Sequence, residues 1–168
     1  TMASVRPFGD ALGRALDGEE QRPLLIASGG LSHDPPVPRL ETAAGTVRDA
    51  LLGAGRNLDA DARDARQRRV IDAGADFARG ASTMQPLAPE WDHEFMQIVG
   101  SGRLTELDAW TAEAMTRDAG HSSHEVRTWV AAYAALGAFG PYRATSSYYR
   151  AIPELIAGFG IATAQPAS

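Results

Sequence analysis

Two short segments carry side chains that could do chemistry. The first, SGGLSHDPPVP at 28–38, places His33 after an apolar run and two glycines. Pro35, Pro36 and Pro38 fix φ and disfavour the α conformation before them, so the loop after His33 should be extended and stiff. Histidine exchanges a proton near neutral pH, and α/β folds place their chemistry in loops at the carboxyl ends of strands. His33 is therefore a candidate acid–base residue, and the alternative is a ring that only caps a strand through backbone hydrogen bonds.

The second segment, GHSSHEVRTW at 120–129, places His124 and Glu125 at the start of a predicted apolar helix. Ser122 followed three residues later by Glu125 has the form of a capping box, in which Glu125 would bind a backbone N–H and no metal. Glu125 also lies four residues before Trp129, which could direct its carboxylate toward the helix face that carries the core residues. An inward carboxylate would need a partner, so a structural role and a ligand role both remain open.

The other polar candidates have less specific surroundings. His93 follows a predicted helix cap and His121 follows a glycine, and we expect both to be exposed. Tyr148, Tyr149 and Arg150 could line a pocket for an anionic aromatic ligand, although adjacent aromatic residues on a strand more often pack against a sheet face.

Composition limits the classes of function. The chain has 168 residues, 44% of them apolar, and a net charge of -5, which suits one soluble domain and disfavours nucleic acid as a partner. Without cysteine, any metal must be held by histidine, aspartate or glutamate. No apolar run approaches the roughly 18 to 20 residues that span a bilayer, and no signal-peptide pattern opens the chain. We therefore expect a cytoplasmic protein with no membrane contact.

Hydrophobic periodicity predicts an α/β fold, with a mixed central sheet flanked by helices. Phe8, Leu12 and Leu16 have the spacing of one face of a helix over 5–17, and a buried strand is predicted at 23–28. The remaining predicted elements are a helix from Leu40 to Gly53 or Gly55, a charged helix at 59–79, a helix capped by Asp92 and extending to Val99, a short helix at Leu104 and Leu107, a helix from Thr111 to Gly120, a central helix at 122–139 and strands at 146–150 and 157–163.

Four blocks in order along the chain resemble one known family. They are SGGLSHDPPVP, PLAPEWDHEFM at 86–96, SSHEVRTWVAAYAA at 122–135 and YYRAIPELIAGFG at 148–160. These blocks resemble the carboxyl-terminal half of the class III extradiol ring-cleavage dioxygenases, and the match covers nearly the whole chain. The resemblance implies that residues 1–168 are the carboxyl-terminal half of a single catalytic domain, here an incomplete portion of the family fold.

The resemblance also implies roles for individual residues. His33 matches the family's acid–base histidine, Glu125 matches the carboxylate of its iron site, and His124 matches a supporting position. Such enzymes hold non-haem Fe(II) by two histidines and one glutamate, and they use dioxygen to open the ring of a catechol, here one of the 3-carboxyethylcatechol type. A homo-oligomer is expected on the same basis.

One departure from the family pattern limits what the chain should do alone. In the family, the two iron-binding histidines and a second acid–base histidine come from an amino-terminal half that precedes the segment matching residue 1 onward. We therefore expect a fragment that needs this missing half as a partner and is inactive in isolation. One alternative is a non-catalytic binding or assembly module that associates through 59–79 and the Trp91 region. Another is that the fragment does not fold stably, because sheet edges and core would be exposed.

Overall fold

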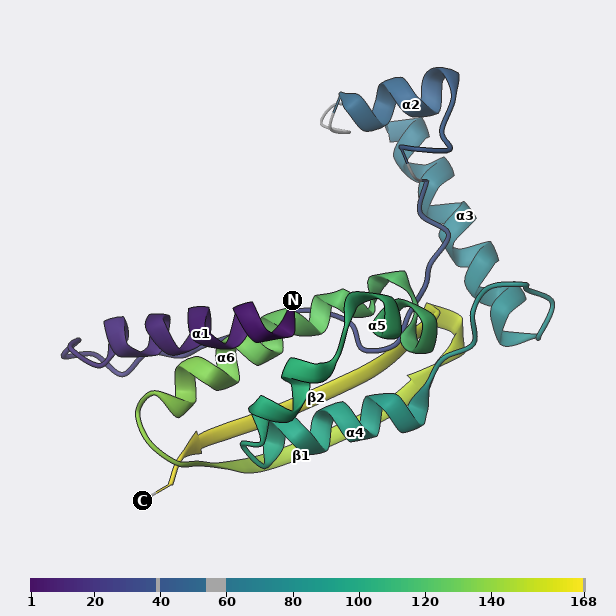
Figure 1. Cartoon of the computed structure of the whole chain (residues 1–168). Helices are drawn as coiled ribbons and strands as arrows, with labels where there is room; N and C mark the ends of the chain where they lie inside the picture. Colours follow the sequence, from purple (N-terminus) through teal and green to yellow (C-terminus); the bar gives the residue numbers. More distant parts are fainter. Residues whose placement is uncertain (39, 54–59, 168) are drawn as a thin grey trace. The chain divides into compact units, whose positions relative to one another are not determined.

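The computed structural model describes residues 1–38, 40–53 and 60–167 (Figure 1). Its elements, in chain order, are α1 (Met2–Leu16), α2 (Gly45–Leu52), α3 (Ala60–Ala78), α4 (Pro89–Gly100), the 3-10 helix η1 (Leu104–Ala109), α5 (Ala112–Ala119), the 3-10 helix η2 (His121–Val126), α6 (Arg127–Gly137), β1 (Tyr142–Ile152), the 3-10 helix η3 (Pro153–Leu155) and β2 (Ala157–Pro166). They form two compact units. The first contains Thr1–Asp34, Gln85–Ile152 and Ala157–Ser168, and the second contains Pro35–Met84 and Pro153–Ile156.

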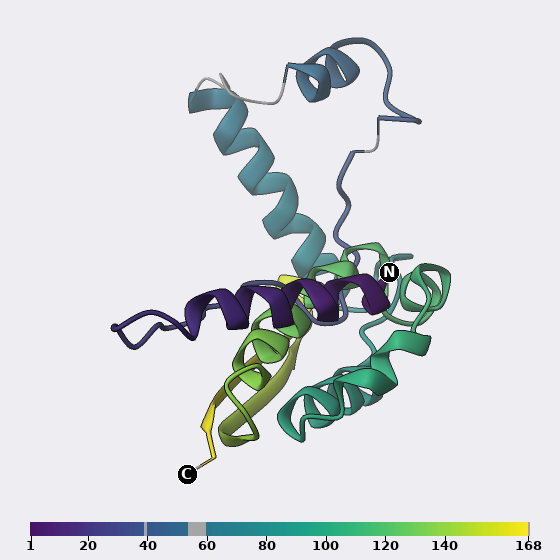
Figure 2. The ribbon, with the colours of Figure 1, turned by 60° about the vertical axis from the view of Figure 1, so that its left-hand side comes forward.

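The first unit is a layer of helices against a two-stranded antiparallel sheet (Figures 1 and 2). β1 pairs with β2 from Tyr142 opposite Pro166 to Ile152 opposite Ala157, with one irregularity near Ala144. Apolar side chains of α4, η1, η2 and α6 form the core between the layers, including Phe95, Val99, Leu107, Val126 and Val130, none of which is exposed. The expected combination of helices and sheet is thus confirmed, and α6 is central as its apolar spacing predicts.

α1 packs against α6 (Figure 1), but through a different face from the one that its periodicity indicates. Its buried residues include Gly9 and Gly13, where an added Cβ would run into the backbone carbonyls of Ala131 and Ala135. Phe8, by contrast, is 65% exposed. Close helix approach requires small residues at the contact, so the two glycines determine which face is buried in this chain.

The predicted buried strand at 23–28 is wrong. Residues 23–30 have no assigned secondary structure, and the side chains of Leu24 and Ile26 are each 82% exposed. A strand forms only when a neighbour supplies backbone hydrogen bonds. Within the described residues the sheet consists of β1 and β2, which pair with each other.

Other element boundaries differ from prediction in ways that affect the site. α4 begins at Pro89, so Asp92 lies inside the helix and is not its cap. The predicted cap of α5 is confirmed, because the Thr111 hydroxyl accepts a hydrogen bond from the backbone N–H of Ala114. The predicted helix at 122–139 is divided into η2 and α6, which places Glu125 on a 3-10 turn.

The second unit contains α2, α3 and η3. α2 ends at Gly53 as predicted, while Gly55 lies outside the described residues. The predicted charged helix at 59–79 is present as α3, starting at Ala60, with residue 59 outside the described part of the chain. Its one buried residue is Gly74, which packs against the backbone of Glu154 in η3. Across the described residues, no helix has the length and apolar character needed to cross a membrane.

Candidate active site

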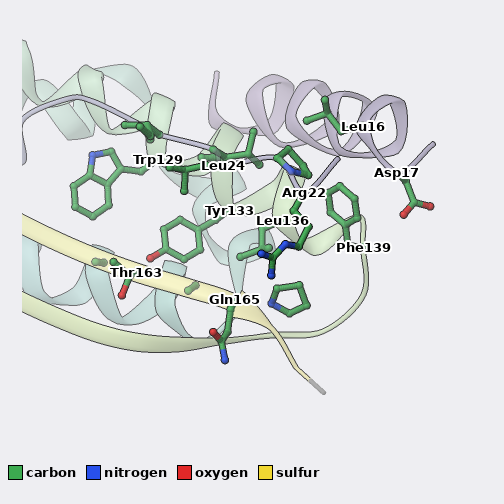
Figure 3. A pocket seen from close by; sticks show the side chains of 18 of the residues that line it. Leu16, Asp17, Arg22, Leu24, Trp129, Tyr133, Leu136, Phe139, Thr163 and Gln165 are labelled. Carbon is green, nitrogen blue, oxygen red and sulfur yellow. The ribbon is translucent and has the colours of Figure 1, made fainter. Parts of the chain in front are cut away.

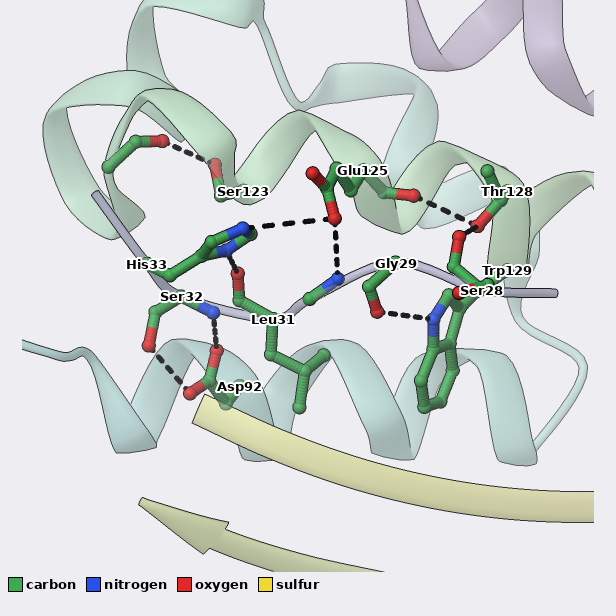
Figure 4. Close-up of polar contacts among 12 residues, drawn as sticks. Ser28, Gly29, Leu31, Ser32, His33, Asp92, Ser123, Glu125, Thr128 and Trp129 are labelled. Atoms are coloured by element: carbon green, nitrogen blue, oxygen red, sulfur yellow. Dashed lines mark hydrogen bonds and ion pairs between the residues drawn. The ribbon is translucent and has the colours of Figure 1, made fainter. Parts of the chain in front are cut away.

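His33 and Glu125 lie side by side in the first unit although they are far apart in sequence (Figure 4). The imidazole Nε2 of His33 is 3.8 Å from the carboxylate Oε2 of Glu125. The His33 side chain is 13% exposed, whereas that of Glu125 is 55% exposed. The pair therefore combines a held imidazole with a carboxylate that solvent or a ligand can reach.

Two adjacent glycines allow this approach. A Cβ on Gly29 would lie 2.6 Å from the backbone oxygen of Glu125, and a Cβ on Gly30 would lie 2.5 Å from Cε1 of the His33 ring. Both distances are far below ordinary van der Waals contact, so a larger residue at either position would displace one of the two site residues. The glycines are thus part of the site's geometry.

One hydrogen bond determines which nitrogen of His33 can exchange a proton. Nδ1 lies 2.8 Å from the backbone oxygen of Leu31. A carbonyl can only accept, so the proton of the neutral ring is assigned to Nδ1. Nε2 is then the basic nitrogen, and it is the one that faces Glu125. The ring does bind the backbone, as the capping alternative proposed, but this bond leaves Nε2 available for chemistry.

Glu125 binds the loop that carries His33. Its Oε2 accepts a hydrogen bond from the backbone N–H of Gly30 at 2.9 Å. The capping box with Ser122 is not formed, because no side chain caps η2. The carboxylate also does not enter the core, as its exposure shows. Oε1 has no hydrogen bond among the described residues, so this oxygen is open to a ligand.

The start of α6 holds the same loop at two further points (Figure 4). The Thr128 hydroxyl donates to the backbone oxygen of Ser28 at 2.9 Å, and the Trp129 indole N–H donates to that of Gly29 at 3.1 Å. Together with Glu125, these side chains bind three successive residues of the loop. Residues 34–38 then continue without helix or strand, as the prolines predict.

The other histidines have separate partners. His124 places Nε2 2.8 Å from the Thr116 hydroxyl, and burial lowers the pKa of its ring. His121 is near Asp34, with Nδ1 3.1 Å from a carboxylate oxygen. His93 is exposed and packs edge-on against the Tyr149 ring. Among the described contacts, none of the three reaches His33 or Glu125.

Sequence reasoning missed Asp92, whose carboxylate has no exposed surface. It binds both the backbone N–H and the hydroxyl of Ser32, the residue before His33 (Figure 4). Desolvation raises the pKa of Asp92, while hydrogen bonds from Ser32 and Tyr149 act in the opposite direction. The sequence signal was an acid in the apolar stripe of α4, three residues before Phe95.

An apolar hollow of about 830 Å³ lies next to this region, between residues 16–27, α6 and β2 (Figure 3). Leu24, Trp129, Tyr133 and Leu136 contribute to its wall, and neither His33 nor Glu125 lines it. Trp129 therefore links the two features, since its indole N–H binds the site loop while its ring contributes to the wall of the hollow.

The donor set tests whether a metal suits this site. Within residues 1–38, 40–53 and 60–167, no group of three or more candidate ligand side chains is close enough together to hold an ion. Glu125 alone has the features of a ligand, namely a reachable carboxylate with one unbonded oxygen beside an imidazole. The described residues thus suit a metal ion through one ligand, Glu125, and the other ligands would have to come from elsewhere.

Comparison with known proteins assigns this arrangement to a family. Residues 1–160 match the family described as the catalytic LigB subunit of aromatic ring-opening dioxygenase, and the chain belongs to that family. The resemblance inferred from the four sequence blocks is confirmed at this level.

Several curated relatives carry one name, 2,3-dihydroxyphenylpropionate/2,3-dihydroxicinnamic acid 1,2-dioxygenase. The protein from Rhodococcus jostii is 54% identical over 163 residues, covering 97% of this chain and 52% of the relative. The protein from Paraburkholderia xenovorans is 55% identical, covering 98% of this chain and 53% of the relative. The protein from Cupriavidus pinatubonensis is 50% identical over 168 residues, covering 100% and 53%. The chain thus spans about half the length of the curated relatives it matches.

Proposed function

We propose that residues 1–168 form the carboxyl-terminal half of an Fe(II)-dependent extradiol dioxygenase domain that opens the ring of a 3-carboxyethylcatechol-type substrate. The observation that carries the proposal is the approach of His33 Nε2 to Glu125 Oε2, 3.8 Å apart at a reachable position. The names of the relatives support the reaction and the substrate class.

His33 is the acid–base residue in this proposal. Catechol binds a metal well only after losing a hydroxyl proton, and a neutral imidazole can accept that proton at a pH near 7. Because Nδ1 of His33 donates to Leu31, Nε2 is the atom that takes up the proton and later returns it. The same hydrogen bond keeps the ring from turning, so the base stays aimed at one place.

Glu125 is the iron ligand in this proposal. Its Oε2 is fixed by the Gly30 N–H, which orients the carboxylate without neutralising it. The chemistry that bound Fe(II) supplies is Lewis-acid polarisation of the catechol oxygens and electron exchange with dioxygen. We assign the remaining ligands to the part of the relatives' length that this chain does not span. On this reasoning the isolated chain is inactive with added Fe(II), and His124 has only a supporting role beside Glu125.

A chimera provides the test. The segment of the Cupriavidus pinatubonensis relative that matches this chain is replaced by residues 1–168, and ring cleavage is followed by the yellow product. The chimera should cleave the catechol, and His33→Ala should lower kcat by about 10² to 10⁴ with the fold intact. Arg103→Ala is the control, because Arg103 is exposed, pairs with Glu106 and contacts neither His33 nor Glu125.

Two results would count against this function. A folded chimera without turnover, beside an active parent enzyme, would contradict the assignment of the chain to catalysis. A His33→Ala variant with the unsubstituted rate would instead support the alternative of a binding or assembly module. Turnover by the isolated 168-residue chain would contradict the claim that the other ligands come from outside it.

A further inference from the structure

Asp92 is a fully buried carboxylate that the reaction described above does not use. Carboxylates are seldom completely buried unless donors surround them. Here Oδ1 accepts the backbone N–H of Ser32 at 2.7 Å, and Oδ2 accepts the hydroxyls of Ser32 and Tyr149, each at 2.7 Å. Three donors from two distant parts of the chain thus converge on one side chain of α4.

Ser32, the residue that Asp92 binds, is itself fully buried, and its backbone N–H, hydroxyl and backbone oxygen all form hydrogen bonds. Its hydroxyl accepts the N–H of Ala88 at 3.0 Å, and its backbone oxygen accepts the N–H of Gly158 at 2.8 Å. A Cβ on Gly158 would overlap the Oδ2 atom of Asp92, so β2 leaves no spare room around the carboxylate. Ser32 therefore cannot shift without breaking several hydrogen bonds at once.

Ser32 lies between the two points that fix the imidazole. The residue before it, Leu31, supplies the backbone oxygen that binds Nδ1 of His33. The residue after it is His33, whose backbone N–H donates to Ala119 at 3.0 Å and whose oxygen accepts from Ser122 at 3.2 Å. A movement of Ser32 would change both the position of the ring and the hydrogen bond that selects its basic nitrogen.

We propose that Asp92, supported by Tyr149, is a positioning residue that sets the orientation and tautomer of His33 through the backbone of Leu31–His33. This inference rests on the proposed role of His33 as the acid–base residue. Asp92 has no contact with His33 or Glu125 among the described residues, so it acts through Ser32 and not on the substrate.

Burial and hydrogen bonding around Tyr149 agree with this role. The hydroxyl of Tyr149 donates to Asp92, and burial together with that bond raises the pKa of the tyrosine, which keeps it protonated as a donor. The hydroxyl of Tyr149 is thus occupied by its hydrogen bond to Asp92. This favours a structural role for Tyr149 over the pocket for an anionic aromatic ligand that was considered from the sequence.

The variants separate positioning from simple loss of stability. Asp92→Ala removes all three acceptor contacts. Asp92→Asn retains a carbonyl oxygen for the Ser32 N–H and an amide that can donate to a rotated hydroxyl, so it should preserve the loop. Tyr149→Phe removes one donor and keeps the ring. Leu107→Ala is the control, because Leu107 is fully buried in η1 and takes no part in the site.

The experiment uses the chimera and two readouts, steady-state kinetics and ¹⁵N NMR of the histidine rings. In Asp92→Ala we expect kcat to fall about 10- to 100-fold with KM changed by less than about threefold, the loss expected from an imidazole displaced by about 1 Å. The ¹⁵N shifts of His33 should move from the Nδ1-protonated pattern toward an average of both tautomers. Asp92→Asn should restore most of the rate and the original shifts, and Tyr149→Phe should show a smaller change in the same direction.

The proposal is overturned if Asp92→Ala loses thermal stability, as Leu107→Ala does, but keeps the original kcat and ring shifts. Failure of Asp92→Asn to restore them would also overturn it. If Asp92→Ala does not fold, Tyr149→Phe decides, since unchanged rate and unchanged ring shifts in that variant contradict the proposal. If the unsubstituted chimera has no turnover, the proposed function fails, while the ring shifts still decide whether Asp92 positions His33.

Discussion

Replacing Gly30 by alanine should reduce catalysis more than it reduces stability. The added Cβ would lie 2.5 Å from Cε1, 2.8 Å from Nδ1 and 3.0 Å from Nε2 of His33. The φ angle of Gly30 is not in the left-handed region, so alanine can adopt its backbone conformation. The perturbation is therefore first of all a collision with the His33 ring, to which the three nearest atoms belong.

The size of the effect follows from these distances. Ordinary contact begins at 3.4 Å, so the ring must retreat by about 0.9 Å from its present position. The retreat breaks the hydrogen bond from Nδ1 to Leu31, which costs about 0.5 to 1.5 kcal/mol of folding free energy. A displacement of about 1 Å at a reacting group can lower the rate by about 10²-fold. We therefore expect a chimera that stays folded and is about a hundredfold slower.

Gly29→Ala provides the contrast. Its Cβ would meet backbone and Cβ atoms of Glu125 at 2.6 to 2.9 Å, and backbone cannot move aside as a ring can. Overpacking of this kind costs about 1 to 3 kcal/mol, so this variant should lose stability as well as activity. Gly18→Ala is the control, because no atom lies within 4 Å of the added Cβ. The assays are kcat from product absorbance and thermal unfolding, and a Gly30→Ala rate within twofold of the parent would refute the reasoning.

Three further predictions concern the metal, pH and helix packing. Glu125→Gln in the chimera should weaken Fe(II) binding by at least about 10-fold, measured as iron content after dialysis, because a charged ligand is lost; unchanged iron content would remove Glu125 from the site. Burial raises the pKa of Tyr133 above 10.0, so the tyrosine of the unfolded chain ionises first and the free energy of unfolding should fall as the pH rises above 10. Tyr133→Phe should lessen that fall, measured by urea unfolding. The substitution should cost little at pH 7, because the buried hydroxyl has no hydrogen-bond partner among the described residues. Gly13→Ala should lower the free energy of unfolding by about 1 to 3 kcal/mol, since its Cβ would collide with the Ala135 backbone, and an unchanged urea midpoint would contradict this packing.

The sequence by itself determined the family and most of the helices. Local signals were enough wherever one residue type makes one local structure, as with the Thr111 cap, the end of α2 at Gly53 and the apolar spacing of α6. His33 and Glu125 could be named because their neighbours match the family's blocks. Their distance could not be known, because the contact depends on how two remote segments pack.

The tertiary structure decided everything that depends on a neighbour. Gly9 and Gly13 bury a face of α1 that is rotated away from the predicted one, because the glycines allow the close approach to α6 that larger apolar residues would prevent. Residues 23–28 form no strand, because a strand requires a partner's backbone. Asp92 looks like a helix cap in the sequence, and only the fold brings Ser32 and Tyr149 to its carboxylate. Periodicity reports what a segment can bury, whereas the packed neighbours determine what it does bury and which polar groups it must satisfy.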